Sequence, residues 1–587
     1  MSDITKIKDP LYGYIKIEDS DITSILNSAE FHRLSDIVQT SYSSVFPTST
    51  HNRFTHSLGV YYLGTIASSA LVKSFASIKI ENFGRDEIEK YKHLFLLACL
   101  LHDVGHAPFS HTGEAFYLED KQNPIWEQLK AEIGDDCFNN DSKGRSFGAP
   151  HEIMSALASL KFFPKLFTNS GEKAFFARCI VGLKYGNKSD IEDVKNCFVE
   201  LLNSKTIDVD KLDYLLRDSF VTGFSSVSID YKRLLSAVCI AEKNDKSGKN
   251  LVLAFNKSAL STLESVVLAH DMERKWIQNH PVIQYENYLV KYIISEVVKY
   301  YQHKNISIFS FSALTTKGCS QFIDIKKFSE FVKNKTKNKT VLKWLDSDFT
   351  PLINDFFESN CINLNTSVRL LTDSDVLATA KNSLSENDII NEYFNRSLRK
   401  KSFWKSESEY KILFEQDAIS FEQDAISKEA LKQLEDRFTS IENGLKIANM
   451  LPIINADALR YFKEQKLKLD FFPGYEKVQQ RELNSTIDLL ELLENFANEQ
   501  GIPFEFVTIS ANQFNTGFNK KDFKEINVYF PNLNNVSFLK DAINLFDAEQ
   551  PRSNFFYLYA KMENRDYQAI SNLVKRLIRF AMDNYQR

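Results

Sequence analysis

The chain has 587 residues, more than one hydrophobic core usually supports, so about three or four domains are expected. Its apolar fraction of 43% and charged fraction of 25% are those of an ordinary globular protein, which excludes a fibrous or disordered chain. A net charge of -5 provides no overall field that would attract nucleic acid or an anionic membrane. Any anionic ligand must therefore be bound by a local group of cations.

The seven cysteines are scattered along the chain and form no CxxC pair, which argues against a disulfide framework and a zinc knuckle. The opening MSDITKIKDP lacks the apolar core of a signal peptide. The strongest apolar run, near Leu94 to Leu101, is far shorter than a membrane span. We therefore expect a cytoplasmic protein without a membrane partner.

Residues 21 to 318 follow a mostly helical pattern, with apolar residues three and four positions apart and short polar breaks between them. Early in this region, HNRFTHSLGV places Arg53 and His56 three residues apart. This spacing puts both side chains on one face of a helix.

The stretch LLACLLHDVGHAPFSH runs an apolar helix directly into His102 and Asp103, which are followed by His106 and His111. Imidazole nitrogen and carboxylate oxygen together suit Fe, Mn, Mg or Zn. A His-Asp dipeptide alone is more often structural than functional, so the prediction of a metal site depends on the neighbouring motifs.

Further along, IDVDKLDYLLRDSF places Asp210, Asp213, Tyr214 and Arg217 at helical spacing on one side. Such a stripe fits either a solvated face with internal ion pairs or a set of functional groups, and the spacing alone does not decide between them. A β-hairpin is predicted next, between residues 234 and 255, where LLSAVCIAE and NLVLAF flank the turn-forming KNDKSGKN. Helices are predicted to resume near residue 258.

The second half of the chain carries weaker signals. The lysine-rich KKFSEFVKNKTKNKTVLKW at 326–344 is predicted to be a solvated helix face, and the repeated FEQDAIS at 414–427 a local duplication in a surface element. In the last 120 residues or so, PFEFVTI, EINVYF and NFFYLYAKM alternate with helical runs such as VKRLIRFAMDNY, which predicts a smaller α+β lobe. The abundant phenylalanines are interpreted as core packing rather than base stacking.

Taken together, the histidine, the His-Asp pair and the distant aspartate resemble the HD superfamily of metal-dependent phosphohydrolases. Three segments are similar to its branch of SAM- and HD-domain deoxynucleoside triphosphate triphosphohydrolases: PTSTHNRFTHSLGV, LLHDVGHAPFSHTGEAF with APHEI after it, and IDVDKLDYLLRDS. The opening KDPLYGYIKI also resembles that branch. The resemblance covers roughly residues 8 to 300.

The resemblance implies a metal ion held by His56, His102, Asp103 and Asp210, with open positions for water and phosphate oxygens. Such an ion acts as a Lewis acid and lowers the pKa of its bound water. The donor set suits Fe, Mn, Mg or Zn, and a magnesium ion is expected to accompany a nucleotide triphosphate.

The resemblance also implies a catalytic group beside the metal. His111 matches the histidine that donates a proton to the leaving ribose oxygen, and Glu114 would orient it where the family usually has aspartate. His106 and His151 match histidines that face the substrate phosphates.

Substrate contacts follow from the same resemblance. Arg53 and Lys211 match phosphate-binding residues, Tyr214 and Asp218 match residues at the sugar, and Gln39 falls near a glutamine that contacts the 3'-hydroxyl. The loop from Gln39 to Arg53 is one residue shorter than in the animal enzymes, and a threonine follows Gln39 where leucine is usual. Discrimination against a 2'-hydroxyl is therefore left open.

The predicted fold class is mainly α, with an all-helical HD phosphohydrolase domain and a small β-hairpin in residues 1–325, a helical connecting region in 326–440, and a C-terminal α+β lobe in 441–587. The predicted reaction converts a deoxynucleoside triphosphate to deoxynucleoside and tripolyphosphate. Two alternatives stay open: an HD hydrolase of a monophosphate, a cyclic nucleotide or single-stranded nucleic acid, and a nucleotide-sensing binding protein. Related enzymes are homo-oligomers that bind regulatory nucleotides, so both properties are expected here.

Overall fold

The computed structural model describes most of the first half of the chain and separate stretches of the second. The described residues are 5–303 with short gaps, 372–409 except 385 and 407, and parts of the last third that include 453–455, 507–510, 525–543 and 557–560. The lysine-rich stretch, the FEQDAIS duplication and the final predicted helix lie outside them. None of the described helices is long and apolar enough to cross a membrane.

The chain begins with an antiparallel hairpin of β1 (Thr5–Asp9) and β2 (Gly13–Ile17), which the sequence analysis did not predict. Gly13 has φ 83° at the turn, a conformation that a side chain disfavours. Ile15 and Ile17 are buried, whereas the lysines between and opposite them face outward. These strands are too short and too rich in lysine to produce a strong alternating pattern.

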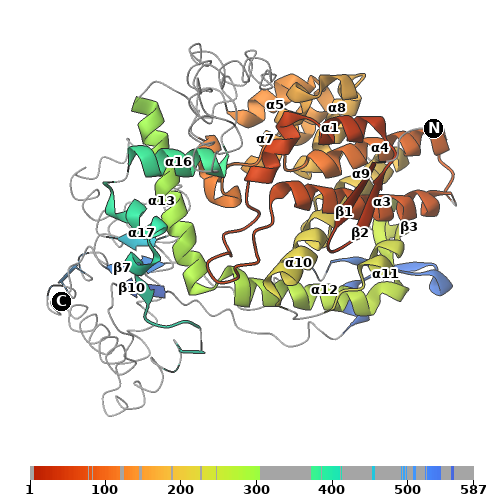
Figure 1. Cartoon of the computed structure of the whole chain (residues 1–587). Helices are drawn as coiled ribbons and strands as arrows, with labels where there is room; N and C mark the ends of the chain where they lie inside the picture. The colour runs from red at the N-terminus through yellow and green to blue at the C-terminus, as the bar shows by residue number, and fades with distance from the viewer. Residues whose placement is uncertain are drawn as a thin grey trace.

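A helical body follows and forms the core (Figure 1). Its main helices are α3 (Arg53–Phe75), α4 (Arg85–Leu101), α7 (Pro150–Phe162), α8 (Ser170–Val181), α9 (Asp190–Leu202) and α10 (Val209–Thr222). Shorter elements are α1 (Ser20–Leu26), α2 (Ala29–His32), η1 (Arg33–Asp36), η2 (Ser110–Leu118), α5 (Ile125–Ile133), α6 (Asp136–Ser142) and η3 (Pro164–Leu166). The second half of α4 is buried on almost every side, as expected of a central helix.

Side-chain caps set where the two helices that matter most for the site begin. Asn52 accepts a hydrogen bond from the backbone N–H of Thr55 (3.1 Å) and starts α3 immediately before Arg53. Asp208 accepts one from the backbone N–H of Lys211 (2.7 Å) and starts α10. Both predicted motifs therefore occupy the first turns of helices.

The predicted hairpin is present as β3 (Val238–Asp245) and β4 (Gly248–Asn256), but its first strand begins four residues later than predicted. Residues 234–236 instead end helix α11 (Tyr231–Ser236), which Asp230 caps through the backbone N–H of Arg233 (3.1 Å). The local cap therefore outweighs the β-rich appearance of this run.

Two strands from the far end of the sequence extend this hairpin. Strand β8 (Asn527–Phe530) pairs in parallel with β4, and β9 (Asn535–Phe538) pairs antiparallel with β8, which produces the order β3-β4-β8-β9. Figure 1 shows these blue strands beside α11 and β3. A second sheet has the order β5-β10-β7-β6, from β5 (Lys401–Ser402), β6 (Ile453–Asn455), β7 (Val507–Ser510) and β10 (Tyr557–Ala560).

The helices after the hairpin lead away from the helical body and return to it. They are η4 (Lys257–Ala259), α12 (Leu260–Glu273), η5 (Arg274–Gln278), α13 (Pro281–His303), α16 (Asp373–Ser383), α17 (Asp388–Phe394) and η9 (Arg396–Leu398), with η13 (Pro531–Leu533) and α23 (Leu539–Ala542) near the end. Figure 1 shows α16 and α17 lying against the long helix α13.

The mainly helical class is confirmed, and the predicted runs PFEFVTI, EINVYF and NFFYLYAKM each overlap an observed strand. The domain boundaries stay predictions.

Candidate active site

The four residues predicted to hold the metal come from three helices and converge on one point. The Nε2 atom of His56 on α3 lies 3.3 Å from the Nε2 atom of His102, which caps the C-terminal end of α4. It also lies 2.9 Å from Asp210 Oδ1 and 3.7 Å from Asp103 Oδ2. His56, His102 and Asp103 are buried. The structure thus brings together side chains up to 154 positions apart in the sequence.

The outer nitrogens of both histidines are occupied, which determines what the inner ones can do. His56 Nδ1 donates to Asp213 Oδ2 (2.7 Å), and His102 Nδ1 donates to the Cys99 carbonyl oxygen (2.9 Å). With Nδ1 of each ring bonded to these acceptors, the two Nε2 atoms are the ones that face each other. Histidines oriented through Nδ1 in this way are the usual metal ligands, and each Nε2 would offer a lone pair once its proton is displaced. These residues therefore fit a divalent ion.

Asp213 holds the ring of His56 in this orientation, although the sequence analysis gave Asp213 no role. Its carboxylate also accepts hydrogen bonds from Tyr12 Oη (2.6 Å) and from Arg217, whose Nη1 donates to Asp9 (3.0 Å). A Cβ atom on Gly59 of α3 would lie 1.8 Å from Asp213 Oδ1, so only glycine allows this approach. The spacing of three residues from Asp210 was the signal that could have identified Asp213.

The opposite charges around the centre control its protonation. Burial lowers the pKa of His56, but hydrogen bonds to Asp210 and Asp213 outweigh burial and raise the pKa to about 9. Burial raises the pKa of Asp103, but Arg53 and the two histidines hold it below its usual range. The carboxylates therefore stay ionised at neutral pH, and a metal ion would replace protons on the imidazoles.

The two predicted phosphate contacts are at the site, and both are paired with carboxylates. Arg53 is buried, with Nη1 donating to Asp103 Oδ2 (2.8 Å) and Nε donating to Ser110 Oγ (2.9 Å). Lys211 Nζ donates to Asp208 Oδ2 (2.5 Å) and to a backbone carbonyl oxygen (2.7 Å). Their binding to phosphate stays a prediction. To bind a phosphate oxygen, Lys211 would have to give up its bond to Asp208.

Glu114 gathers the three remaining predicted histidines into a second cluster. Its Oε1 atom forms an ion pair with His111 Nδ1, lies 2.9 Å from His151 Nδ1 and lies 4.0 Å from His106 Nε2. His111 is the exposed member, with 67% of its side chain accessible. Burial raises the pKa of Glu114, but His111 and His151 lower it below its usual range. The carboxylate is thus ionised and orients His111.

This second cluster is less suited to a cation than the first. The rings of His106 and His151 are stacked, with centroids 4.5 Å apart and planes 20° from parallel, so their in-plane lone pairs do not converge. Burial and the nearby Arg53 hold the pKa of His106 well below its usual value. Both ring nitrogens of His106 lack a hydrogen-bond partner among the described residues. A neutral, unpartnered imidazole beside an arginine suits an anionic ligand better.

Two of the predicted sugar contacts, Tyr214 and Asp218, lie further along α10 than Asp210, and the third, Gln39, lies near them through His51. Asp218 Oδ1 is 2.8 Å from His51 Nε2, and the backbone N–H of Gln39 donates to the His51 carbonyl oxygen (3.0 Å). The side-chain oxygen of Gln39 is buried and has no partner among the described residues. Burial, with Glu273 and Asp210 nearby, raises the pKa of Tyr214 well above its usual value, so its hydroxyl stays protonated.

Two residues in this region were missed by the sequence analysis. His51 bridges the backbone of Gln39 and the carboxylate of Asp218. Glu273 on α12 is buried beside Asp218, and both burial and Asp218 raise its pKa well above its usual value. Its Oε1 atom accepts a hydrogen bond from Gln278 (2.9 Å). Glu273 stands in HDMERKWIQNHPVIQYENYL, a segment with no motif that would indicate a functional residue.

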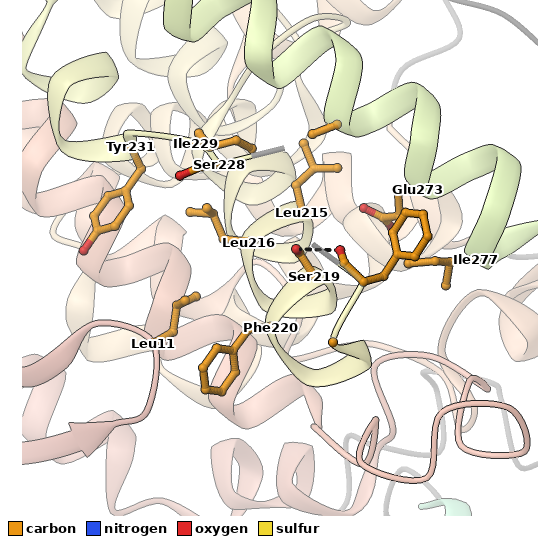
Figure 2. A pocket seen from close by; sticks show the side chains of 13 residues that line it. Leu11, Leu215, Leu216, Ser219, Phe220, Ser228, Ile229, Tyr231, Glu273 and Ile277 are labelled. Atoms are coloured by element: carbon orange, nitrogen blue, oxygen red, sulfur yellow. Dashed lines mark hydrogen bonds between the residues drawn. The ribbon is translucent and has the colours of Figure 1, made fainter. Parts of the chain in front are cut away.

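A cavity of about 510 Å³ lies next to this region, along α10 and α12. Figure 2 shows Leu216, Phe220 and Ile277 among its apolar walls, with Glu273 as a polar wall residue. No residue predicted to bind metal or substrate lines this cavity. Its lining residues include no lysine, arginine or histidine that could bind a polyphosphate. The cavity is therefore separate from the predicted metal centre.

Comparison with known proteins identifies an HD domain in the chain. The sequence pattern of the HD domain matches residues 53–136. Two deoxynucleoside triphosphate triphosphohydrolases are similar: the SAMHD1 homolog of Dictyostelium discoideum (28% identical over 240 residues, 39% of this chain and 38% of the relative) and SAMHD1 of Homo sapiens (28% over 256 residues, 41% and 37%). An uncharacterized protein of Mycoplasma genitalium is 28% identical over 268 residues, 45% of this chain and 53% of the relative.

The chain thus covers about half of the Mycoplasma relative and less of the two SAMHD1 proteins. Among solved structures, a phosphohydrolase from Bacteroides thetaiotaomicron has a TM-score of 0.51 at 16% identity, and the match covers 95% of this chain and all of that one. At this identity the likeness concerns the fold alone.

Proposed function

From the premise that the chain carries an HD domain of the phosphohydrolase superfamily, we propose that it hydrolyses deoxynucleoside triphosphates to deoxynucleoside and tripolyphosphate. The observation that supports this most is the pairing of two clusters across Arg53. On one side Arg53 contacts Asp103 in the metal centre, and on the other it bonds to Ser110, the residue before His111. Metal ligands, a cation and a proton donor are therefore adjacent.

The metal centre provides the electrophilic half of the proposed reaction. A divalent ion held by His56, His102, Asp103 and Asp210 would supply Lewis-acid activation and a water of lowered pKa. Arg53 would stabilise negative charge on the phosphate oxygens, because a guanidinium offers two parallel N–H donors. Its own contact with Asp103 keeps it beside the ion.

His111 is the group proposed to protonate the leaving ribose oxygen. Its side chain is exposed, and its Nδ1 is paired with Glu114, which leaves Nε2 as the atom that would hold the transferred proton. Glutamate replaces the aspartate usual in the resembling branch, and its longer side chain also reaches His151. His106, which is uncharged, and His151 would face the phosphates.

The substrate class rests on the relatives and on the sugar-side residues. The named relatives are deoxynucleoside triphosphate triphosphohydrolases. By the resemblance of the sequence motifs, Tyr214 and Asp218 match residues of that branch at the deoxyribose, and Gln39 falls near another. The unpartnered side-chain oxygen of Gln39 supports a ligand hydroxyl as its partner. Contacts of these residues with a deoxyribose would favour the proposal over hydrolysis of another phosphoester.

Product analysis tests the proposal. Purified protein would be incubated with each deoxynucleoside triphosphate and ribonucleoside triphosphate in the presence of Mn, Mg, Fe or Zn, and the products separated by chromatography. Tripolyphosphate and free deoxynucleoside are expected, with Asp103→Ala as the blank. Pyrophosphate plus monophosphate would contradict the proposal, as would diphosphate plus orthophosphate. Turnover only of monophosphates or cyclic nucleotides would indicate another phosphohydrolase, and binding without turnover a sensor.

A further inference from the structure

Helix α16 begins with a carboxylate that is bonded to two segments of the candidate active site. Asp373 Oδ2 accepts a hydrogen bond from the backbone N–H of Val38 (2.8 Å), and Oδ1 accepts one from the backbone N–H of Phe109 (2.6 Å). These partners are 335 and 264 positions away in the sequence. Asp373 is only 5% exposed. One side chain from beyond the HD segment therefore joins two of its loops.

Both loops carry predicted site residues. Val38 immediately precedes Gln39, and Phe109 lies two positions before His111. Phe109 and Ser110 have φ of 58° and 56°, the left-handed region that residues with side chains seldom adopt. Such a turn persists only where its surroundings hold it, and the bond from Phe109 to Asp373 is one such restraint.

Ser110 links the same turn to the metal centre. Its hydroxyl donates to the Val38 carbonyl oxygen and accepts from Arg53 Nε (2.9 Å). Asp373, Val38, Ser110 and Arg53 thus form a continuous hydrogen-bonded path. A shift of the Phe109–Ser110 turn would move both the guanidinium of Arg53 and the imidazole of His111.

The N-terminal end of α16 is docked at a second point. Ser374 Oγ donates to Asp36 Oδ1 (2.7 Å) on η1, and Arg33 on the same turn donates to the His106 carbonyl oxygen (2.8 Å). Thr372 caps α16 through the backbone N–H of Asp375 (3.3 Å). Hydrogen bonds therefore connect the start of α16 to η1, and η1 to the loop after the His-Asp pair.

We infer that Asp373 is a positioning residue of the active site, which holds the Val38–Gln39 backbone and the Phe109–Ser110 turn where they place Arg53 and His111. The effect of Asp373 on turnover rests on the proposed hydrolysis. The geometry itself is independent of that proposal.

A carboxylate is required because the two amides bond to separate oxygens, and an amide side chain offers only one acceptor. Burial and the nearby Asp36 raise the pKa of Asp373 to about 7, although the two N–H bonds and Arg33 lower it. Tyr393 of α17 also interacts with Asp373. Because the folded pKa lies above the unfolded value of 3.8, protonation stabilises the fold at low pH and this stabilisation is lost as the pH rises through 7. The doubly accepting, ionised form is thus the one present above pH 7.

The test compares Asp373→Asn with Asp388→Asn, the same change at the first position of α17, where the side chain is exposed. Turnover of a deoxynucleoside triphosphate by the full-length protein would be measured from pH 6 to pH 9. The ratio of wild-type to Asp373→Asn kcat is expected to rise from near 1 at pH 6 to about 10 or more at pH 8, with metal content and melting temperature at pH 8 preserved. Groups that titrate equally in both proteins change both kcat values alike and therefore do not affect this ratio. Asp388→Asn should match the wild type throughout.

Amide hydrogen exchange provides a readout that does not require activity. Exchange in residues 37–39 and 107–111 is expected to be faster in Asp373→Asn at pH 8 and unchanged elsewhere. Equal kcat and equal exchange in the two proteins would overturn the inference, as would equal effects of Asp388→Asn. If the wild type hydrolyses no nucleotide, the proposed function fails, and the exchange result alone decides the inference. If Asp373→Asn does not fold, protection of residues 107–111 in the wild type must still increase as the pH rises through 7, after correction for intrinsic exchange; constant protection would overturn it.

Discussion

Asp213 forms four hydrogen bonds beside the metal centre although it is not a predicted ligand. It accepts from His56 Nδ1 (2.7 Å), Tyr12 Oη (2.6 Å) and Arg217 Nε and Nη2 (3.0 and 3.1 Å). Burial raises its pKa, but Arg217 and His56 outweigh burial and lower it. The ionised carboxylate therefore holds the Nδ1 proton of His56, so that Nε2 is the atom that would bind an ion.

We predict that Asp213→Asn weakens metal binding about 10- to 100-fold, the effect typical of losing an outer partner of a ligand histidine. The amide has one acceptor oxygen and cannot serve His56, Tyr12 and Arg217 together. The dissociation constant would be measured by competition with a chelator. Asp103→Ala, which removes a ligand, defines complete loss. An unchanged constant would show that Asp213 does not orient His56.

A second prediction at this scale concerns the proton donor. His111→Ala should lower kcat about 100-fold or more while KM and metal content stay near their wild-type values, because a general acid acts in the transition state. His93→Ala is the matched control, since His93 is half-exposed on α4 and pairs with Asp19. Parallel loss of metal and turnover would instead identify His111 as a ligand.

At the scale of elements, the centre depends on how closely α3 approaches α10. Gly59 lies one turn after His56 and faces the carboxylate of Asp213. The N-terminal hairpin supports the same contact from outside, since Tyr12 and Asp9 bond to Asp213 and Arg217. A helix pair and a hairpin together thus keep the two predicted ligands His56 and Asp210 beside each other.

Gly59→Ala tests this packing, because we expect it to lower the stability of the protein, whereas helix propensity alone would raise it. In a free helix the change stabilises by about 1 kcal/mol. Here the new Cβ would lie 1.8 Å from Asp213 Oδ1 and 2.5 Å from Arg217 Nη2, so we expect a net loss of about 1–3 kcal/mol, a lower melting temperature and lower metal content. Ser69→Ala, on the exposed face of α3, should leave both unchanged. A raised melting temperature for Gly59→Ala would contradict the packing.

At the scale of the whole molecule, distant parts of the chain complete the first half. Strand β8 adds to the β3–β4 hairpin with Val528 opposite Phe255, and both side chains are buried. Helix α16 reaches the site through Asp373. Strand β8 of the last third and helix α16 are therefore both in contact with the first half of the chain.

We predict that the protein is a homo-oligomer whose assembly or activity responds to nucleotides. The prediction rests on the resembling branch, whose enzymes assemble and bind activating nucleotides, and on the roughly 250 residues beyond the HD segment. Light scattering with and without nucleotides should show a mass change, or rates in nucleotide mixtures should exceed those with one nucleotide. A monomer with simple saturation kinetics under all conditions would rule this out.

The sequence by itself determined the helical class, the hairpin after residue 234 and the residue types of the metal centre. Helical periodicity and caps are local, so Arg53 and His56 could be placed on one helix face, and the His-Asp pair at a helix end, without tertiary information. The motif spacings then limited the chemistry to a few classes.

Only the tertiary structure decided which groups support that centre. Asp213, His51, Glu273 and Asp373 act through neighbours that are distant in sequence, and an acceptor for a backbone N–H at Phe109 leaves no periodic pattern. The pairing of β8 with β4 is likewise non-local, because strand partners are chosen by burial and register across the folded chain rather than by the strand's own residues. Hydrogen bonds of this kind exist only after the core has brought their partners together.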